Sequence, residues 1–578
     1  MMDYGSGAGI GALREAGMRP ARDSGKRARV VAVFMAAIFG LTAVKGASLS
    51  LSGGTTSAAE AMPALFPVVG NRRADIVDRN GELLATTVDA TSLFADPRAI
   101  WNVADTASRL AAVLDGVDEA RLAERLADRD RAFVWVKRHL TPRQHAAVFD
   151  LGLEGIGFRQ EPRRAYPKGD LAGHIIGYTS IDGEGLAGAE RLGNDGLLSS
   201  ETPLMLTIDA GVQFALETEL DAAATRLGAI GGAGVIVQVK TGEIRAMASW
   251  PSFNPNRAGR YVEDDPARFN RATTGVYELG SVFKPLTVAA ALSRGAIAAD
   301  DVFNTADPIV FGDTAIKDLH PVPSPASVTR ILADSSNIGT VRIAQAMGGD
   351  RHISTLADFG LTRKPAGRIP GVSAPLLPER WTPLTAATVS YGHGLAVSPL
   401  SMTAAYAALG NRGVRHEVKI FDDRPSGAGE PPPKVPTIAV SRDASEAVIE
   451  MLRSAVLDGT GRAADVPGYR VAGKTGTAEK PIDGVYDPNR NLNSFAAVFP
   501  ADRPEYAILV MLDEPNSPPE VHQETSGGVA RTVVGDTAAS TAAPLAGRII
   551  ERVAPLLGVM PRWDDPANGP ANAGRQSE

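Results

Sequence analysis

Apolar and polar positions follow one another along the chain in patterns that predict strands, helices and one membrane-length segment. Val30 to Leu51 gives 22 mostly apolar residues with a single charge, Lys45, and about 20 such residues span a bilayer as a helix. Helical periodicity predicts helices at 104–115, 118–128, 141–150, 212–224, 444–457 and 545–554. Short apolar runs predict strands at 204–209, 233–239, 244–249, 469–472, 494–499 and 506–512, and the Asn80-Gly81 turn predicts a hairpin within 73–85. The mixture predicts an α/β protein.

The apolar segment 30–51 is preceded by a basic leader. Residues 1–29 carry six Lys or Arg against three Asp or Glu, which predicts that they stay in the cytoplasm and that the chain after the segment lies outside. A cleaved signal peptide, with Ala59-Glu60-Ala61 as its cleavage site, is the competing interpretation. The leader is long for a signal peptide, and Ala59 lies far from the apolar run. We therefore expect an uncleaved single-pass anchor.

Composition limits the chemistry that the chain can perform. The 578 residues are enough for two to four domains, and a net charge of -7 argues against nucleic acid as the main partner. The absence of cysteine excludes disulfides, thiolate metal sites and a cysteine nucleophile. We expect no cofactor. Residues 52–202 show no nucleophile–base pair and are predicted to be a support domain, 203–562 a catalytic domain, and 563–578 a disordered polar tail.

Ser281 and Lys284 form the one S-x-x-K pattern in the chain. If Ser281 opens a helix, Lys284 lies one turn along on the same face, which is the geometry of a serine nucleophile with a lysine base. The helix that follows is apolar on nearly every side and belongs inside a domain. Burial matters because a lysine with an ordinary pKa of about 10.4 is protonated at neutral pH and accepts no proton. Taken alone, the pattern is explained equally well by a purely structural role, with Ser281 as a helix cap and Lys284 as a solvated residue of the first turn.

Two later clusters supply partners for Ser281. Ser335 and Asn337, in the S-x-N order, offer a hydroxyl for proton transfer and an amide that can hold a peptide group. Lys474 begins a K-T-G-T run whose other members are Thr475, Gly476 and Thr477. A strand that ends in a lysine and two threonines, with a glycine that admits substrate to the backbone, suits a terminal carboxylate.

Each tripeptide alone is unspecific, because Ser252-Phe253-Asn254 and Lys240-Thr241-Gly242 repeat the second and third patterns before Ser281. Lys240-Thr241-Gly242 is best explained as a hairpin turn. The order S-x-x-K, S-x-N, K-T-G-T, at intervals of 54 and 139 residues, is the specific feature. In that order the sequence resembles the penicillin-recognising serine enzymes.

The resemblance extends over most of residues 70–550 and is to the class B penicillin-binding proteins. It includes the segments 73–85, 163–190, 206–213, 234–256, 316–321 and 391–394. Ser335-Ser336-Asn337, with the modest N-terminal domain, resemble the division-specific (FtsI) type. Leu279 stands where proline is usual and Ala74 where glycine is usual, and neither touches the chemistry.

The resemblance implies a penicillin-binding transpeptidase fold, an antiparallel sheet flanked by helices, with a dimerisation-like support domain and a single transmembrane helix. It implies that Ser281 attacks a D-Ala-D-Ala stem peptide and that Lys284 takes its proton. Ser335 then relays a proton in the positive field of Lys474, and Asn337 orients the substrate amide.

Further roles and partners are implied in the same way. Thr475 and Thr477 bind the carboxylate side of the substrate, and the backbone N–H groups of Ser281 and Thr477 form the oxyanion hole. Peptidoglycan stem peptides and β-lactams are the implied ligands. A polytopic glycosyltransferase and other divisome proteins are the implied partners, at the inner membrane with the catalytic domain in the periplasm.

Other classes of protein use the same motif residues to form an acyl-enzyme or to bind penicillin. A D,D-carboxypeptidase or β-lactamase-like hydrolase is one, and a non-catalytic penicillin sensor or division scaffold is another. The anchor and the support domain favour the transpeptidase, because a freely diffusing hydrolase needs neither. A second, glycosyltransferase activity is disfavoured, since the segment before the catalytic domain has no cluster of catalytic carboxylates. His320 and His393 lie near the motifs, and His320 is interpreted as structural because lysine already fills the base role.

Overall fold

A computed structural model describes residues 72–200, 202–262, 264–422, 435–482, 485–516, 522–526, 529–533 and 537–563. The predicted leader 1–29 and anchor 30–51 lie outside these residues, as does the predicted tail beyond residue 563. No helix within the described ranges combines the length and the apolar character needed to cross a membrane.

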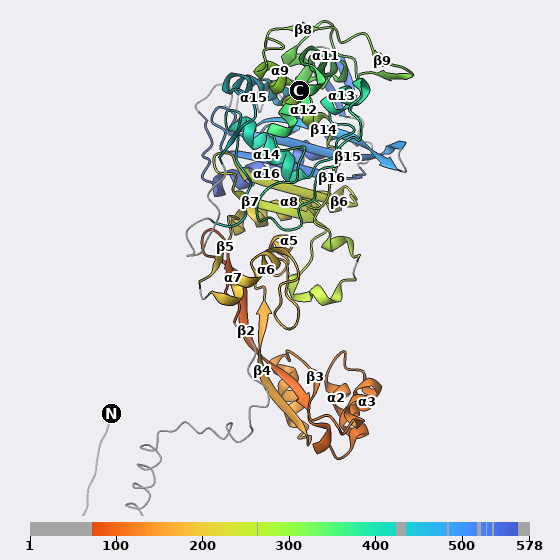
Figure 1. The fold of residues 1–578 in the computed structure, drawn as a ribbon, viewed down its shortest axis with the longest axis vertical. Helices are drawn as coiled ribbons and strands as arrows, with labels where there is room; N and C mark the ends of the chain where they lie inside the picture. The colour runs from red at the N-terminus through yellow and green to blue at the C-terminus, as the bar shows by residue number, and fades with distance from the viewer. Residues whose placement is uncertain are drawn as a thin grey trace, which may run out of the picture. The chain divides into compact units, whose positions relative to one another are not determined.

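The N-terminal part is built on a sheet in which β3, β2, β1 and β5 are neighbours and β4 also pairs with β2 (Figure 1). Its strands are β1 (Ile76–Val77), β2 (Leu83–Ala95), β3 (Val134–Lys137), β4 (Ile156–Ala165) and β5 (Leu204–Met205). Its helices are α2 (Val103–Val113), α3 (Glu119–Ala127), α4 (Pro142–Asp150), α5 (Gly173–Ile176), α6 (Gly188–Leu192) and α7 (Asn194–Ser199). The predicted hairpin and the three predicted helices of this part are confirmed. The strand predicted at 204–209 is shorter, at two residues.

A buried ion network holds the N-terminal part together beside this sheet. Glu190 is fully buried and accepts from the guanidinium groups of Arg73, at 2.9 Å, and Arg164, at 2.6 Å. Arg73 also donates to Asn194 Oδ1 at 2.7 Å. A buried carboxylate is tolerated when it is paired in this way. Loss of one partner leaves the other charge buried without compensation, which destabilises the fold.

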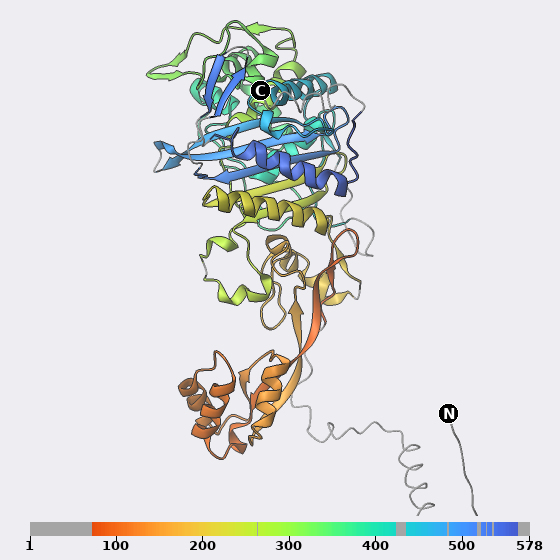
Figure 2. The ribbon, with the colours of Figure 1, turned by 180° about the vertical axis from the view of Figure 1, so that it is seen from behind.

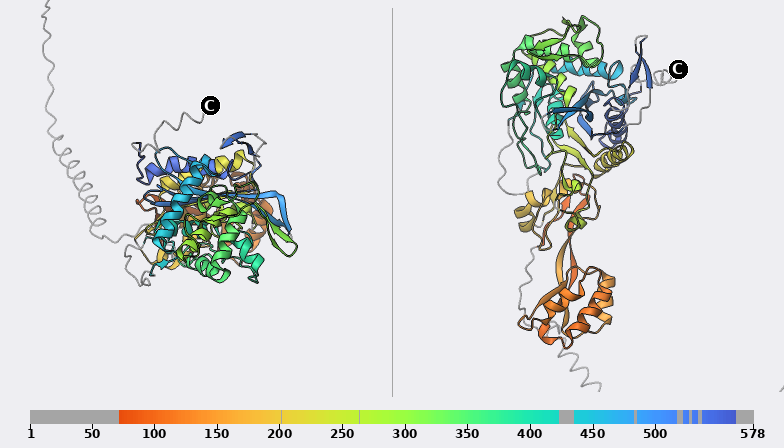
Figure 3. Two further views of the ribbon diagram at one scale, coloured as in Figure 1. Left: turned by 90° about the horizontal axis from the view of Figure 1, so that it is seen from above. Right: turned by 90° about the vertical axis from the view of Figure 1, so that its right-hand side faces the viewer.

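The C-terminal part is organised around a five-stranded antiparallel sheet in the order β14-β15-β16-β6-β7. Its strands are β6 (Gly231–Gln238), β7 (Ile244–Trp250), β14 (Ala472–Ile482), β15 (Val485–Phe499) and β16 (Tyr506–Asp513). Helices α8 (Ala210–Arg226) and α16 (Ala542–Leu556) cover one face (Figure 2), and α14 (Pro399–Gly410) lies on the other. Figure 3 shows the sheet between the two helical layers. The predicted antiparallel sheet flanked by helices is confirmed.

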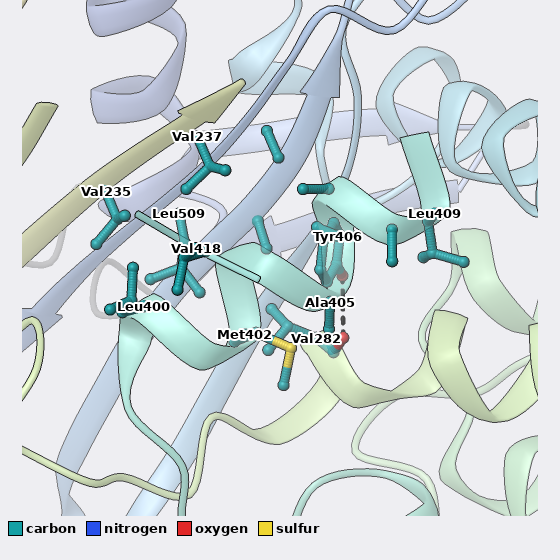
Figure 4. Close-up of a cluster of buried hydrophobic side chains, with 14 of the residues drawn as sticks. Val235, Val237, Val282, Leu400, Met402, Ala405, Tyr406, Leu409, Val418 and Leu509 are labelled. Carbon is teal, nitrogen blue, oxygen red and sulfur yellow. Dashed lines mark hydrogen bonds between the residues drawn. The ribbon is translucent and has the colours of Figure 1, made fainter. Parts of the chain in front are cut away.

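Both faces of this sheet are apolar, because alternate residues of each central strand enter different cores. Val235, Val237 and Leu509 face the core that contains α14 (Figure 4), whereas Ile236 and Ile508 face the core under α8 and α16. Successive side chains of a strand point to opposite faces of the sheet, and here each face packs against a hydrophobic core, so neither face is exposed to solvent. This explains why the strands appear in the sequence as continuous apolar runs.

The remaining helices form a group beside β14 that carries two of the three motifs. They are α9 (Lys284–Ser293), α10 (Val328–Ala333), α11 (Asn337–Met347), α12 (Gly349–Asp358), α13 (Pro383–Ser390) and α15 (Arg442–Leu457). Short strands also pair in this region and beyond it: β8 (Val302–Phe303), β9 (Ile309–Phe311), β10 (Thr314–Ile316), β11 (Ala326–Ser327), β12 (Val414–Arg415), β13 (Thr437–Ile438), β17 (His522–Ser526) and β18 (Val529–Val533). The helices predicted at 212–224, 444–457 and 545–554 are confirmed as α8, α15 and α16.

Besides the strand at 204–209, two predicted strands are wrong in their limits. The strand predicted at 494–499 is only the last part of β15, which begins at Val485. The sequence predicts a strand at 469–472 with the K-T-G-T run at its end, but β14 begins at Ala472 and continues to Ile482. Gly473 and Gly476 lower the strand propensity of this stretch. The long antiparallel pairing with β15, from Ala472 opposite Val498 to Ile482 opposite Val485, outweighs that preference. The K-T-G-T run therefore lies within a strand and not at its end.

Candidate active site

Ser281 lies in a 3-10 turn, Gly280–Phe283, immediately before helix α9. The α-helix thus begins at Lys284 rather than at Ser281, and the Lys284 backbone N–H donates to the Ser281 carbonyl. Gly280 has φ +60, a conformation that favours glycine, which allows the chain to turn sharply before the serine. The turn is fixed from the core side, where the Tyr406 hydroxyl donates to Val282 O at 2.9 Å (Figure 4). Ser281 itself is half-buried, so it remains open on one side.

Lys284 is fully buried, as the apolar character of the helix predicts. Its Nζ donates to Ser335 Oγ at 3.1 Å and also to the Ser335 carbonyl. Burial lowers the pKa of Lys284 well below its ordinary value, and the positive charge of Lys474 lowers it further, against an opposing effect of Asp318. The amine is therefore suited to accept a proton near neutral pH.

The second motif is held in an unusual backbone conformation between α10 and α11. Ser335 has φ +63, which is uncommon for a residue other than glycine and is typical of strained functional positions. Ser336 is the N-cap of α11, where its Oγ accepts from Gly339 N at 2.9 Å. Asn337 begins α11, and its Nδ2 donates to Lys317 O at 3.2 Å. The cap turns the Ser335 hydroxyl towards Lys284.

Asp318 anchors this motif, a role that the sequence did not reveal. Its carboxylate accepts from the Ser336 hydroxyl at 2.7 Å and from the backbone N–H groups of Asn337 and Ile338, the latter at 2.9 Å. The carboxylate is thus paired with the first turn of α11. A carboxylate at a helix N-terminus is favourable both as a hydrogen-bond acceptor and towards the helix dipole.

The third motif lies on β14 against the turn that carries Ser281. A Cβ placed on Gly476 would lie 2.3 Å from Leu279 O, so glycine permits the close approach of the strand to that turn. Ser494, on the neighbouring strand β15, donates to both Gly476 O and Leu279 O, at 3.2 and 3.3 Å. The strand and the turn are thus connected directly beside Ser281.

Lys474 is the second fully buried amine of the site. Its Nζ donates to Thr460 Oγ1 and Thr475 Oγ1, each at 3.2 Å, and Thr460 and Thr475 share a hydrogen bond of 2.7 Å. Burial lowers the pKa of Lys474 to about 7, while the charge of Asp334 acts in the opposite direction. Further along the strand, Thr477 is half-buried, and its Oγ1 accepts from Ala538 N at 3.1 Å.

The three motifs thus converge in space as their order predicts. Residues 232–538 match the penicillin binding protein transpeptidase domain family, and residues 69–197 match the penicillin-binding protein dimerisation domain family. The chain belongs to the penicillin-binding protein transpeptidases. It is therefore a serine-type peptidoglycan transpeptidase to which β-lactams bind.

Named relatives of this penicillin-binding protein agree with that assignment. The probable peptidoglycan D,D-transpeptidase FtsI of Caulobacter vibrioides is 38% identical over 520 residues, covering 87% of this chain and 85% of the relative. The peptidoglycan D,D-transpeptidase FtsI of Escherichia coli K12 is 33% identical over 484 residues, covering 78% and 80%. Among solved structures, penicillin binding protein 3 of Mycobacterium tuberculosis complexed with aztreonam superposes with a TM-score of 0.64 at 28% identity, covering 85% of this chain and 97% of that one.

The structure of this penicillin-binding protein shows different local conformations for the two tripeptides that repeat the motif patterns elsewhere in the chain. Lys240-Thr241-Gly242 forms the turn between β6 and β7, with Gly242 at φ +73, as predicted. Ser252-Phe253-Asn254 precedes another 3-10 turn, where Asn254 is the cap. His320 is exposed. His393, by contrast, is half-buried, and the charge of Lys284 contributes, after burial, to lowering the pKa of its ring to about 4.

A separate cavity of about 620 Å³ lies away from this chemistry. It is lined by residues that include His174, Tyr178, Phe253, Arg268 and Arg271, and none of the residues of the three motifs contributes to it. This cavity therefore does not contain the three motifs. The convergence of Ser281, Lys284, Ser335 and Lys474 marks the candidate active site instead.

Proposed function

We propose that this protein cross-links peptidoglycan stem peptides during septal cell-wall synthesis, through an acyl-enzyme on Ser281. The observation that carries the proposal is the meeting of two buried amines, Lys284 and Lys474, with two hydroxyls, Ser281 and Ser335, on segments far apart in the chain. The names of the relatives support transpeptidation over the hydrolase and sensor alternatives.

The first half-reaction forms the acyl-enzyme. Neutral Lys284 takes the proton of the Ser281 hydroxyl as Oγ attacks the carbonyl of the penultimate D-Ala. The backbone N–H groups of Ser281 and Thr477 stabilise the oxyanion. The C–N bond breaks, and the leaving D-Ala amine receives its proton through Ser335, which is hydrogen-bonded to Lys284.

Substrate is held on either side of the nucleophile. Asn337 orients a peptide amide, and Thr475 and Thr477, with the backbone of Gly476, bind the carboxylate side. The buried charge of Lys474 favours the anionic end of the substrate. In the second half-reaction the amine of another strand attacks the ester, Ser281 leaves, and a new peptide bond completes the cross-link.

We further propose that segment 30–51 anchors the protein in the inner membrane and that residues after it lie in the periplasm. A polytopic glycosyltransferase and other divisome proteins are the proposed partners, because a cross-linking enzyme needs newly made glycan strands. The charge asymmetry of residues 1–29 supports this orientation.

Fluorescent penicillin labelling of the full-length protein tests the proposal. The wild type should label, retain the label for many minutes, and localise at the septum, whereas Ser281→Ala should not label. Release of the label within seconds would support a β-lactamase-like hydrolase. Equal labelling of both proteins would contradict the role of Ser281, and a side-wall distribution would contradict the septal role.

A further inference from the structure

Glu278 lies three residues before Ser281 and connects the nucleophile segment to a distant strand. Its half-buried carboxylate accepts from the Tyr486 hydroxyl, which lies 3.2 Å from Oε1 and 3.0 Å from Oε2. Tyr486 belongs to β15, 208 residues further along the chain, in the β14–β15 hairpin that extends past the rest of the sheet (Figure 1). The carboxylate is thus fixed at the end of the strand pair that carries the K-T-G-T run.

An aromatic cluster links the partner of this carboxylate, Tyr486, to the surroundings of Lys284. The ring of His393 stacks on Tyr486 with centroids 5.5 Å apart, and Tyr391 packs edge-on against His393 at 5.3 Å. His393 lies near enough to Lys284 for the charge of the lysine to lower the pKa of the histidine ring. With a pKa of about 4, the ring is uncharged at neutral pH and provides no cation for Glu278.

Within the described ranges, Glu278 forms no ion pair. Burial raises its pKa, and hydrogen bonds from the Tyr486 hydroxyl and the Gly394 backbone N–H act in the opposite direction. The pKa of Tyr486 is raised by burial first, then by the charge of Glu278 and, more weakly, of Glu479 on β14. Two carboxylates therefore lie near the same hydroxyl. A half-buried carboxylate without a cation is costly, and a cationic ligand would offset that cost.

We propose that Glu278, oriented by Tyr486, binds a primary ammonium group of the stem peptide beside the turn that carries Ser281. The inference rests on the proposed function, in which one strand supplies an amine to the acyl-enzyme. Because cross-linked strands are chemically alike, the donor strand carries the same amine. The ammonium can thus come from either strand, and the test separates the two sources.

Two thioester stem-peptide analogues test whether the ammonium bound by Glu278 belongs to the donor strand. They differ only in having a free or an acetylated side-chain amine. The readout is the ratio of their kcat/KM values. For the wild type we expect the free amine to be preferred by about tenfold, and for Glu278→Gln the ratio should fall towards one. Tyr486→Phe, which keeps the ring and removes the hydroxyl, should give an intermediate ratio. Glu379→Gln, a change at an exposed glutamate, is the matched control and should keep the wild-type ratio.

A second experiment tests whether the ammonium belongs to the acceptor strand. A diamino acid is added as acceptor, and the partition of the acyl-enzyme between aminolysis and hydrolysis is measured. If the acceptor amine binds Glu278, the acceptor concentration for half-maximal aminolysis rises about tenfold in Glu278→Gln while the donor ratio is unaffected. The inference is overturned if Glu278→Gln slows both donors equally and leaves the acceptor concentration unchanged, as a merely structural role would. Failure of the wild type to turn over either donor would instead contradict the proposed function.

Discussion

The Nζ atom of Lys284 lies 3.1 Å from the hydroxyl oxygen of Ser335, a residue 51 positions later in the chain. This hydrogen bond joins the base of the first motif to the hydroxyl of the second. It offers a short path by which the proton taken from Ser281 can reach a leaving amine. Ser335 reaches this position with a left-handed backbone, and the strain is offset by the cap at Ser336 and by the carboxylate of Asp318.

The two buried lysines predict a bell-shaped dependence of penicillin acylation on pH. In the proposed mechanism neutral Lys284 is the base, so the rate should rise as pH increases through its lowered pKa. The same mechanism needs Lys474 charged, so the rate should fall as pH rises through about 7. Stopped-flow measurement of acylation across pH 4 to 10 checks both limbs.

Replacing Lys474 by arginine identifies the group responsible for the falling limb. A guanidinium stays charged throughout this pH range, so Lys474→Arg should shift the falling limb upward by more than about one pH unit, whatever its absolute rate. Arg442→Lys, at an exposed position, is the control and should leave both limbs in place. A rate that keeps rising to pH 10 in the wild type would show that Lys474 does not act as a charged group.

Asp318→Asn should weaken the S-x-N motif without touching the nucleophile. The substitution removes the charge from hydrogen bonds to Ser336, Asn337 and Ile338. We expect a loss of about 1–3 kcal/mol in the free energy of unfolding and acylation slower by about tenfold. Thermal unfolding and penicillin labelling rates measure the two effects. Asp313→Asn, at an exposed site on the neighbouring hairpin, should change neither, and wild-type acylation in Asp318→Asn would contradict the anchoring role.

Gly476→Ala should separate β14 from the turn that carries Ser281. The added Cβ would lie 2.3 Å from Leu279 O and 2.6 Å from Ser494 Oγ, so one of the two segments must move. Overpacking of this kind costs about 1–3 kcal/mol, and we expect acylation to slow by at least about tenfold. Gly259→Ala, where a Cβ meets no atom within 4 Å, is the control. Normal labelling of Gly476→Ala would mean that the close approach is not needed for acylation.

The sequence predicted which motifs meet in space better than it predicted the residues that hold them in place. Ser281, Ser335 and Lys474 were singled out because their order along the chain is specific, and the burial of Lys284 followed from the apolar helix around it. Asp318 was not assigned its role, because three hydrogen bonds to another segment leave no local pattern. Glu278 was missed for the same reason, since its partner Tyr486 lies 208 residues away.

The fold was predictable where apolar periodicity is strong and less so where backbone pairing decides. Helices α8, α15 and α16 agree with their predicted ranges, because each buries a continuous apolar face. The limits of β14 were wrong because two glycines weaken its local preference, and its pairing with β15 is a property of the folded chain. The 3-10 turn before α9 has no distinct sequence pattern, because it differs from an α-helical start only in hydrogen-bond spacing.

Peptide mapping of the penicillin adduct tests the central claim most directly. The full-length protein is acylated with penicillin, digested, and analysed by tandem mass spectrometry. Convergence of the three motifs on one nucleophile predicts a single stoichiometric penicilloyl group on Ser281 and none in Ser281→Ala. A stoichiometric adduct on Ser335, or on any other serine of the wild-type protein, would contradict it.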